Sequence, residues 1–220
     1  MKRFLALLLL LTLSLTLFAC NKKQKKNDNT PDDGTENAAY YTAKLEAVAE
    51  PTNFVQFEMD NGATFVVALY PEYAPETVAN FQNLVASGFY NGLTFHRLYE
   101  GFMIQGGCPN GNGTGSTTPI KGEFASNGFT QNTLAHERGV ISMARRSDPD
   151  SGSCQFFIMH KKATHLDGQY AAFGKVVAGM KTIDYLATLP VTYQDTSTEK
   201  SKPVKAPVIK AVTFVNYVAE

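Results

Sequence analysis

The chain has 220 residues, with 20 Lys and Arg against 20 Asp and Glu, three Cys and no Trp. That length suits one large domain or two small ones, and 44% apolar against 18% charged residues argues against wholesale disorder. A formal net charge of zero removes the electrostatic case for a nucleic-acid partner, which needs a cationic surplus. Three cysteines are too few for a disulfide framework.

The first 19 residues are typical of a secretory signal peptide. Lys2 and Arg3 precede an apolar run from Phe4 to Ala19, which is shorter than the about 20 residues that a membrane-spanning helix needs. Residues 17–20 read Leu-Phe-Ala-Cys and resemble a bacterial lipobox, in which Cys20 is lipidated and becomes the new N-terminus. We therefore expect a protein of the bacterial cell envelope, anchored by lipid to a membrane and facing the periplasm or the exterior. An ordinary signal peptide and an uncleaved single-pass anchor are the alternatives.

Residues 20–50 are expected to form the lipidated cysteine and a flexible tether. Residues 21–37 contain no apolar side chain and no periodicity, which is typical of disordered segments. Four lysines close to Cys20 suit either contact with anionic lipid headgroups or a merely soluble spacer. Residues 38–49 suit either a short helix or a continued linker, and a single domain is expected over 51–220.

Short strands dominate the expected domain. Two β-rich runs, 53–59 and 63–70, flank Asp60-Asn61-Gly62, and Asn-Gly between such runs predicts a hairpin. Further strands are expected over 93–98, 102–106, 140–144, 155–160, 170–177 and 211–218, with a polar loop over 192–207 before the last of them. Many short strands and few helices indicate a sandwich or a closed barrel.

Two helices are expected within this domain. The first begins at Pro75 and ends at Ser87-Gly88, and the three- and four-residue spacing of its apolar residues predicts one buried stripe: Val78, Phe81 and Val85. The second covers 180–189 and is stopped by Pro190.

Six motifs are not explained by this periodicity. They are Phe-His-Arg at 95–97, Gly-Phe-Met-Ile-Gln-Gly-Gly at 101–107, Ser-Met-Ala at 142–144, Gln-Phe-Phe-Ile at 155–158, Leu-Asp-Gly at 166–168 and Phe-Gly-Lys-Val at 173–176. In this order and spacing they resemble the cyclophilin family of peptidyl-prolyl isomerases, over residues 51–220. The resemblance implies a mainly β fold: a closed eight-stranded antiparallel β-barrel capped by two α-helices, with the peptide in an outer groove.

The resemblance also implies roles for individual residues. Arg97 is the expected catalytic residue, and neither a metal nor a cofactor is required. Substrate-binding positions are expected at Phe102, Met103, Gln105, Gly113, Ala144, Arg145, Gln155, Phe157, His165, Leu166 and Tyr170. Tyr170 stands where many members carry His. His165 stands where many carry Trp, and because that Trp supplies an indole hydrogen bond and a flat apolar contact, we expect weak binding of cyclosporin.

Several other side chains have a structural interpretation. His96 neighbours Arg97 on an expected strand and should point to the other face. Cys108 and Cys154 suit either a disulfide or two free thiols. Together with His136, His160 and His165 these cysteines lack the spacing of metal ligands. The glycines at 111, 113 and 115 are expected in turns rather than in a phosphate-binding loop.

Two functions are compatible with these features. The first is a prolyl isomerase that turns X-Pro bonds in exported proteins and so assists their folding. The alternative is a peptide-binding or chaperone module that retains the groove with little turnover. Both take proline-containing polypeptides as partners, and we expect a monomer.

Overall fold

The computed structural model of the chain describes residues 45–194 and 198–218. The expected signal peptide, Cys20 and the first part of the expected tether lie outside the described residues. The helices are α2 (Pro75–Ala86) and α3 (Met180–Thr188), with short 3-10 turns η1 (Ala125–Asn127), η2 (Pro149–Ser151) and η3 (Thr164–Leu166). The strands are β1 (Glu46–Ala47), β2 (Phe54–Met59), β3 (Thr64–Leu69), β4 (Phe95–Tyr99), β5 (Met103–Gly106), β6 (Val140–Met143), β7 (Phe156–Met159), β8 (Ala172–Ala178), β9 (Val191–Tyr193), β10 (Lys200–Pro203) and β11 (Ile209–Asn216).

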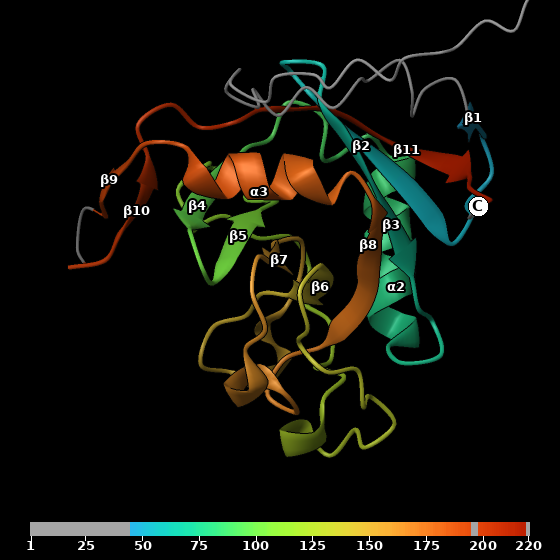
Figure 1. Ribbon diagram of the computed structural model, residues 1–220. Coiled ribbons are helices and arrows are strands. Elements are labelled where there is room, and N and C mark those ends of the chain that lie inside the picture. Colours follow the sequence, from blue (N-terminus) through green and yellow to red (C-terminus); the bar gives the residue numbers. More distant parts are fainter. Residues whose placement is uncertain (1–44, 195–197, 219–220) are drawn as a thin grey trace, which may run out of the picture. The chain divides into compact units, whose positions relative to one another are not determined.

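One curled antiparallel sheet contains all the strands except β9 and β10 (Figure 1), in the order β1-β11-β2-β3-β8-β6-β7-β5-β4. Apart from the two-residue β1, its eight strands are the expected ones, so the mainly β, eight-stranded architecture is confirmed. The expected closure of the barrel is only partial. Within the described ranges, the edge at β4 meets β11 at a corner, through the bridge between Thr94 and Val208. Beyond that corner β4 packs against β10 instead, which leaves a half-barrel.

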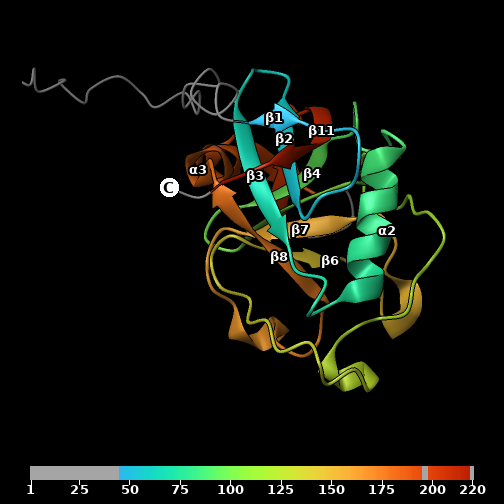
Figure 2. The same ribbon diagram turned by 90° about the vertical axis from the view of Figure 1, so that its right-hand side faces the viewer.

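Both helices lie where the sequence predicts them, and the strands lie between them in Figure 2. α2 begins with Pro75 and buries Val78, Phe81 and Val85, as expected. Its N-terminus is capped from a distance, because the carboxylate of Glu123 accepts hydrogen bonds from the backbone nitrogens of Glu76 (3.0 Å) and Thr77 (2.7 Å). None of the helices in the described ranges combines the length and the apolar character that a bilayer crossing demands.

The sheet separates two apolar clusters. The main core lies on its concave side, where the ring of Phe156 meets those of Phe57, Phe81, Tyr90 and Phe95 at centroid distances of 5.5–5.9 Å. The second cluster lies on the other face and includes Met103, Val140, Phe157, Met159 and Leu166. Side chains alternate between the faces of a strand, so β5, β6 and β7 each contribute to both clusters.

Two segments differ from the expectation. The expected polar loop over 192–207 contains most of a small hairpin, in which β9 and β10 pair antiparallel. The segment lacks the alternating apolar pattern because the hairpin is largely exposed, with Ser201 and Pro203 as its buried residues. Neither alternative for residues 38–49 included a strand, yet Glu46 and Ala47 pair with the end of β11.

Candidate active site

A cavity of about 140 Å³ opens on the outer face of the sheet, over the second cluster. Met103 of β5, Phe157 of β7 and Leu166 of η3 form its buried apolar floor, with exposed fractions of 2%, 5% and 8%. Every residue lining the cavity is one of those expected from the sequence: Arg97, Phe102, Met103, Gln105, Ala144, Arg145, Phe157, Leu166 and Tyr170. A floor of this kind suits a compact apolar ring such as that of proline.

Arg97 places a guanidinium at the side of this cavity. It lies on β4 directly opposite Gln105 of β5 in the antiparallel ladder, because β4 and β5 are joined by a tight hairpin. Its Nη1 lies 3.5 Å from Oε1 of Gln105. Its Nε and Nη2 each donate to the carboxylate of Glu199, at 2.7 Å, a partner not expected from the sequence.

An amide chain extends from Arg97 toward a second, smaller cavity. Gln105 Nε2 donates to Oε1 of Gln155 at 3.1 Å. Gln155 Nε2 in turn donates to the carbonyl oxygens of Gly113 (2.9 Å) and Gly115 (2.7 Å). The second cavity measures about 80 Å³, and both Gly113 and Gln155 line it as expected. Since Gln105, Ala144 and Arg145 line both cavities, the two form one extended groove.

Arg145 is held in place rather than free in the groove. Its Nε and Nη2 donate to the carbonyl of Gln169 at 3.1 and 3.0 Å. Its guanidinium carbon lies 4.7 Å from the centre of the Tyr170 ring and 5.0 Å from that of Phe124, which are cation–π distances. Arg145 therefore serves as a wall between the cavities and fixes the ring of Tyr170.

A buried histidine supports the floor from behind. His136 is 1% exposed, and its ring stacks on Phe157 with centroids 5.9 Å apart. Its Nδ1 lies 3.0 Å from Oδ1 of Asp167, and its Nε2 lies 3.0 Å from Oγ of Ser142. Burial lowers the pKa of His136 despite the opposing effect of Asp167. The trio resembles a Ser-His-Asp arrangement, but Ser142 is completely buried, so its hydroxyl does not face the groove.

His96 and His165 occupy different environments. The expected position of His96 on the face opposite Arg97 is wrong, because the register of β4 shifts between Phe95 and Arg97 and the His96 ring lies beside Gly113 of the groove. His96 is buried, and burial followed by the charge of Arg97 lowers its pKa to about 4. His165 is exposed and lines neither of the two cavities. It stacks instead on Phe102, with centroids 5.8 Å apart and planes inclined by 25°, so its link to the groove is through Phe102.

The two cysteines described are free and buried thiols rather than a disulfide. Cys108 supports the groove, because its Sγ accepts hydrogen bonds from the backbone nitrogens of Gly113 (3.2 Å) and Gly115 (3.3 Å). Over the described ranges, no three His, Cys, Asp or Glu side chains come together as a metal site would require.

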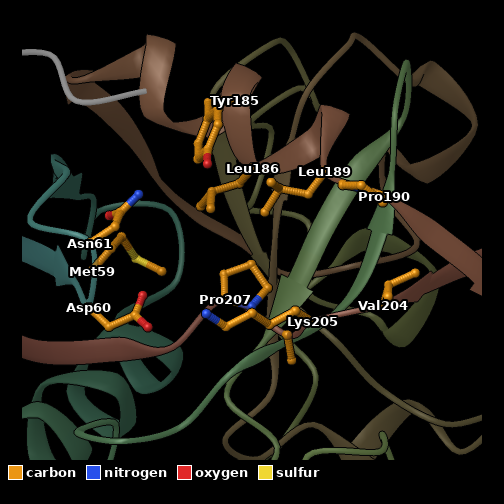
Figure 3. A pocket seen from close by; sticks show the side chains of 11 residues that line it. Met59, Asp60, Asn61, Tyr185, Leu186, Leu189, Pro190, Val204, Lys205 and Pro207 are labelled. Atoms are coloured by element: carbon orange, nitrogen blue, oxygen red, sulfur yellow. The ribbon is translucent and has the colours of Figure 1, made fainter. Parts of the chain in front are cut away.

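A larger cavity, of about 250 Å³, lies elsewhere. Figure 3 shows it between the β2–β3 turn, the end of α3 and the segment before β11, lined by Asp60, Tyr185, Leu189, Pro190 and Pro207 among others. None of its lining residues is an expected site residue, and it contains no guanidinium. We therefore place the active site in the groove beside Arg97.

Comparisons with known proteins agree with this location. The family model described as "Cyclophilin type peptidyl-prolyl cis-trans isomerase/CLD" matches residues 54–214. Peptidyl-prolyl cis-trans isomerase B of Bacillus subtilis is 48% identical over 126 residues, which are 57% of this chain and 84% of the relative. Peptidyl-prolyl cis-trans isomerase-like 3 of Gallus gallus is 44% identical over 125 residues, 57% of this chain and 76% of the relative. The crystal structure of a cyclophilin type isomerase of Cryptosporidium parvum, in the presence of the dipeptide Ala-Pro, aligns with a TM-score of 0.64 and 30% identity, covering 73% of this chain and 97% of that one.

Proposed function

Because the chain belongs to the cyclophilin family and is a peptidyl-prolyl cis-trans isomerase, we propose that Arg97 is its catalytic residue and that exported polypeptides are its substrates. The observation that carries the first part is the position of the Arg97 guanidinium beside the apolar floor of a cavity of about 140 Å³. The second part rests on the signal peptide and lipobox expected from residues 1–20.

The reaction requires only that the twisted amide bind better than the planar one. Rotation about a peptide bond costs about 18–20 kcal/mol because nitrogen shares its lone pair with the carbonyl, although the planar cis and trans forms of an X-Pro bond differ little in free energy. In the twisted state the lone pair is localised on the prolyl nitrogen, which then accepts a hydrogen bond. A guanidinium at that point stabilises the twisted state more than either planar state, which is catalysis by differential binding.

The remaining groove residues would hold the peptide while the bond turns. The floor of Met103, Phe157 and Leu166 takes the proline ring, so the carbonyl that precedes proline is the part that moves. Gln105 and the backbone at Ala144 offer polar groups beside the floor. The second cavity, at Gly113 and Gln155, takes a side chain that precedes proline. The Ala-Pro dipeptide named with the Cryptosporidium relative supports proline-containing peptides as ligands.

A protease-coupled assay on a proline-containing peptide tests the role of Arg97. We expect Arg97→Ala to lower kcat/KM by about a hundredfold, the effect of losing one preorganised donor. Arg138→Ala is the matched control, since Arg138 forms an exposed ion pair with Asp184 outside the groove. Equal rates for Arg97→Ala and the wild type would refute the assignment. Peptide binding without acceleration by the wild type would favour the peptide-binding module instead.

The lipid anchor and the exported substrates need a separate experiment in cells. Palmitate labelling should attach to the wild-type protein and be lost in Cys20→Ser, with release of the protein from the membrane fraction. Labelling that persists in Cys20→Ser would refute the anchor without affecting the isomerase assay.

A further inference from the structure

A carboxylate from the far end of the chain meets the guanidinium of Arg97. Glu199 lies immediately before β10 and is 102 residues away from Arg97 in sequence. Its two oxygens accept from Nε and from Nη2, both at 2.7 Å. This fork-to-fork geometry fixes the plane of the guanidinium as well as its position. The two side chains are 30% and 28% exposed, so the pair is partly shielded from water.

Glu199 is itself held by the β9–β10 hairpin. The hydroxyl of Ser201, a buried residue, donates to Oε1 of Glu199. Ser201 accepts in turn from Nε2 of Gln194 at 3.1 Å, and the backbone nitrogen of Gln194 donates to the carbonyl of Glu199 at 3.1 Å. Figure 1 shows β9 and β10 next to β4, which carries Arg97. The hydrogen bonds within the hairpin thus fix the position of the Glu199 carboxylate that faces β4.

The pairing leaves the other side of the guanidinium available. A guanidinium has five N–H donors, and Glu199 uses the one on Nε and one on Nη2. Nη1 lies on the side of Gln105, 3.5 Å from its Oε1, and Arg97 lines the cavity above the apolar floor. The hydrogen bond from Arg97 also lowers the pKa of the Glu199 carboxyl, so the carboxylate stays charged at neutral pH.

We infer that Glu199 is a positioning residue for Arg97: it holds one edge of the guanidinium so that the opposite edge faces the prolyl nitrogen. The inference rests on the proposed catalytic role of Arg97. Two effects of Glu199 oppose each other, since its charge weakens the positive field of Arg97 while its fork removes the rotational freedom of a long side chain. The second effect is larger, because a partly exposed ion pair is screened by water whereas catalysis by a donor depends on its fixed placement.

The test measures catalysis and binding separately. We expect Glu199→Ala to lower kcat/KM by about tenfold, in line with the loss of one orienting contact, while the affinity for a proline-containing peptide, measured by NMR titration, stays within twofold. Glu199→Gln, which keeps one acceptor oxygen, should lose less. Glu58→Ala is the matched control, because it removes an exposed ion pair between Glu58 of β2 and Lys210 of β11, and it should leave kcat/KM unchanged.

Two further measurements separate positioning from a merely structural role. The Nε–H resonance of Arg97 should shift in Glu199→Ala and not in Glu58→Ala. In an Arg97→Lys background, Glu199→Ala should have little further effect, because an ammonium cannot form the fork. An unchanged or higher kcat/KM in Glu199→Ala, or an equal loss in both backgrounds, would overturn the inference. If Arg97→Ala is impaired and Glu199→Ala is not, the inference fails alone; if Arg97→Ala is unimpaired, both fail.

Discussion

Phe156 and Phe157 are consecutive on β7, and their rings lie on opposite faces of the sheet. Phe156 is at the centre of the aromatic core, with four neighbouring rings within 5.9 Å. Phe157 lies in the second cluster and forms the floor of the groove. The two-residue period of a strand therefore assigns stability mainly to one ring and substrate binding mainly to its neighbour.

This division can be tested by replacing each of the two phenylalanines with leucine. Phe156→Leu should lower the free energy of unfolding by about 1–3 kcal/mol, through lost packing and lost edge contacts, with kcat/KM within twofold of the wild type. Phe157→Leu should lower kcat/KM by about tenfold, because the proline ring loses its flat support. Urea unfolding and the protease-coupled assay measure the two quantities. The same pattern of losses in both variants would contradict the division.

Glu123 caps the N-terminus of α2 although it lies outside the helix, so its replacement should lower the free energy of unfolding. Glu123 is 3% exposed, and Glu123→Ala leaves the backbone nitrogens of Glu76 and Thr77 without their acceptor. We expect a loss of about 2 kcal/mol, the scale for a lost cap and a lost buried charged hydrogen bond. Thermal and urea unfolding of Glu123→Ala beside Glu76→Ala check this. Glu76 is exposed, and its variant should have the smaller effect; the reverse order would contradict the cap.

Acid should destabilise the protein through His96. The pKa of His96 in the folded protein is about 4, below the ordinary value of about 6.5 that applies in the unfolded chain. Between these values the unfolded chain binds a proton that the folded protein does not, so the free energy of unfolding falls as pH decreases from about 6.5 to 4. The loss is on the order of 3 kcal/mol, and the lowered pKa of His136 adds in the same direction.

Urea unfolding at a series of pH values measures this dependence. His96→Gln should flatten the curve between pH 6.5 and 4, because the replacement does not titrate. Curves of equal slope for His96→Gln and the wild type would show that His96 is not the group responsible.

Weak inhibition by cyclosporin remains a prediction. His165 is exposed and stacks on Phe102, so it offers a smaller ring than indole at the edge of the groove. We expect His165→Trp to tighten inhibition by about tenfold, the value of one added hydrogen bond and apolar contact. Inhibition curves in the isomerase assay provide the measurement, with His160→Trp as a control outside the groove. Sub-micromolar inhibition of the wild type would contradict the prediction.

Much of the groove was predictable because six motifs resemble the cyclophilin family, and the structure shows that these motifs lie on adjacent short strands. Arg97 and Gln105 are close in sequence and joined by a hairpin, so a local motif determines their juxtaposition. Gln155, immediately before β7, and Phe157, on β7, also belong to one local motif. All nine residues lining the main cavity were expected, and His165 alone among the expected positions lines neither cavity of the groove.

Glu199 and Glu123 were not predictable, for a shared physical reason. Each acts on a partner that is far away in sequence: 102 residues for Glu199 and Arg97, and 46 for Glu123 and Thr77. Nothing in the polar segment over 192–207 indicates which carboxylate will face the sheet. The partial closure of the barrel escaped prediction similarly, since strand patterns give the number of strands but not how their outer edges meet.

The pairing of β2 with β11 has a consequence for when the protein can fold. Glu58 of β2 and Lys210 of β11 are 152 residues apart, so β2 is synthesised long before its partner strand. Arg97 likewise precedes Glu199 by 102 residues. Contacts of such high sequence separation form slowly. A chain emerging from a ribosome or a translocon would therefore become an active isomerase only after β11 has emerged.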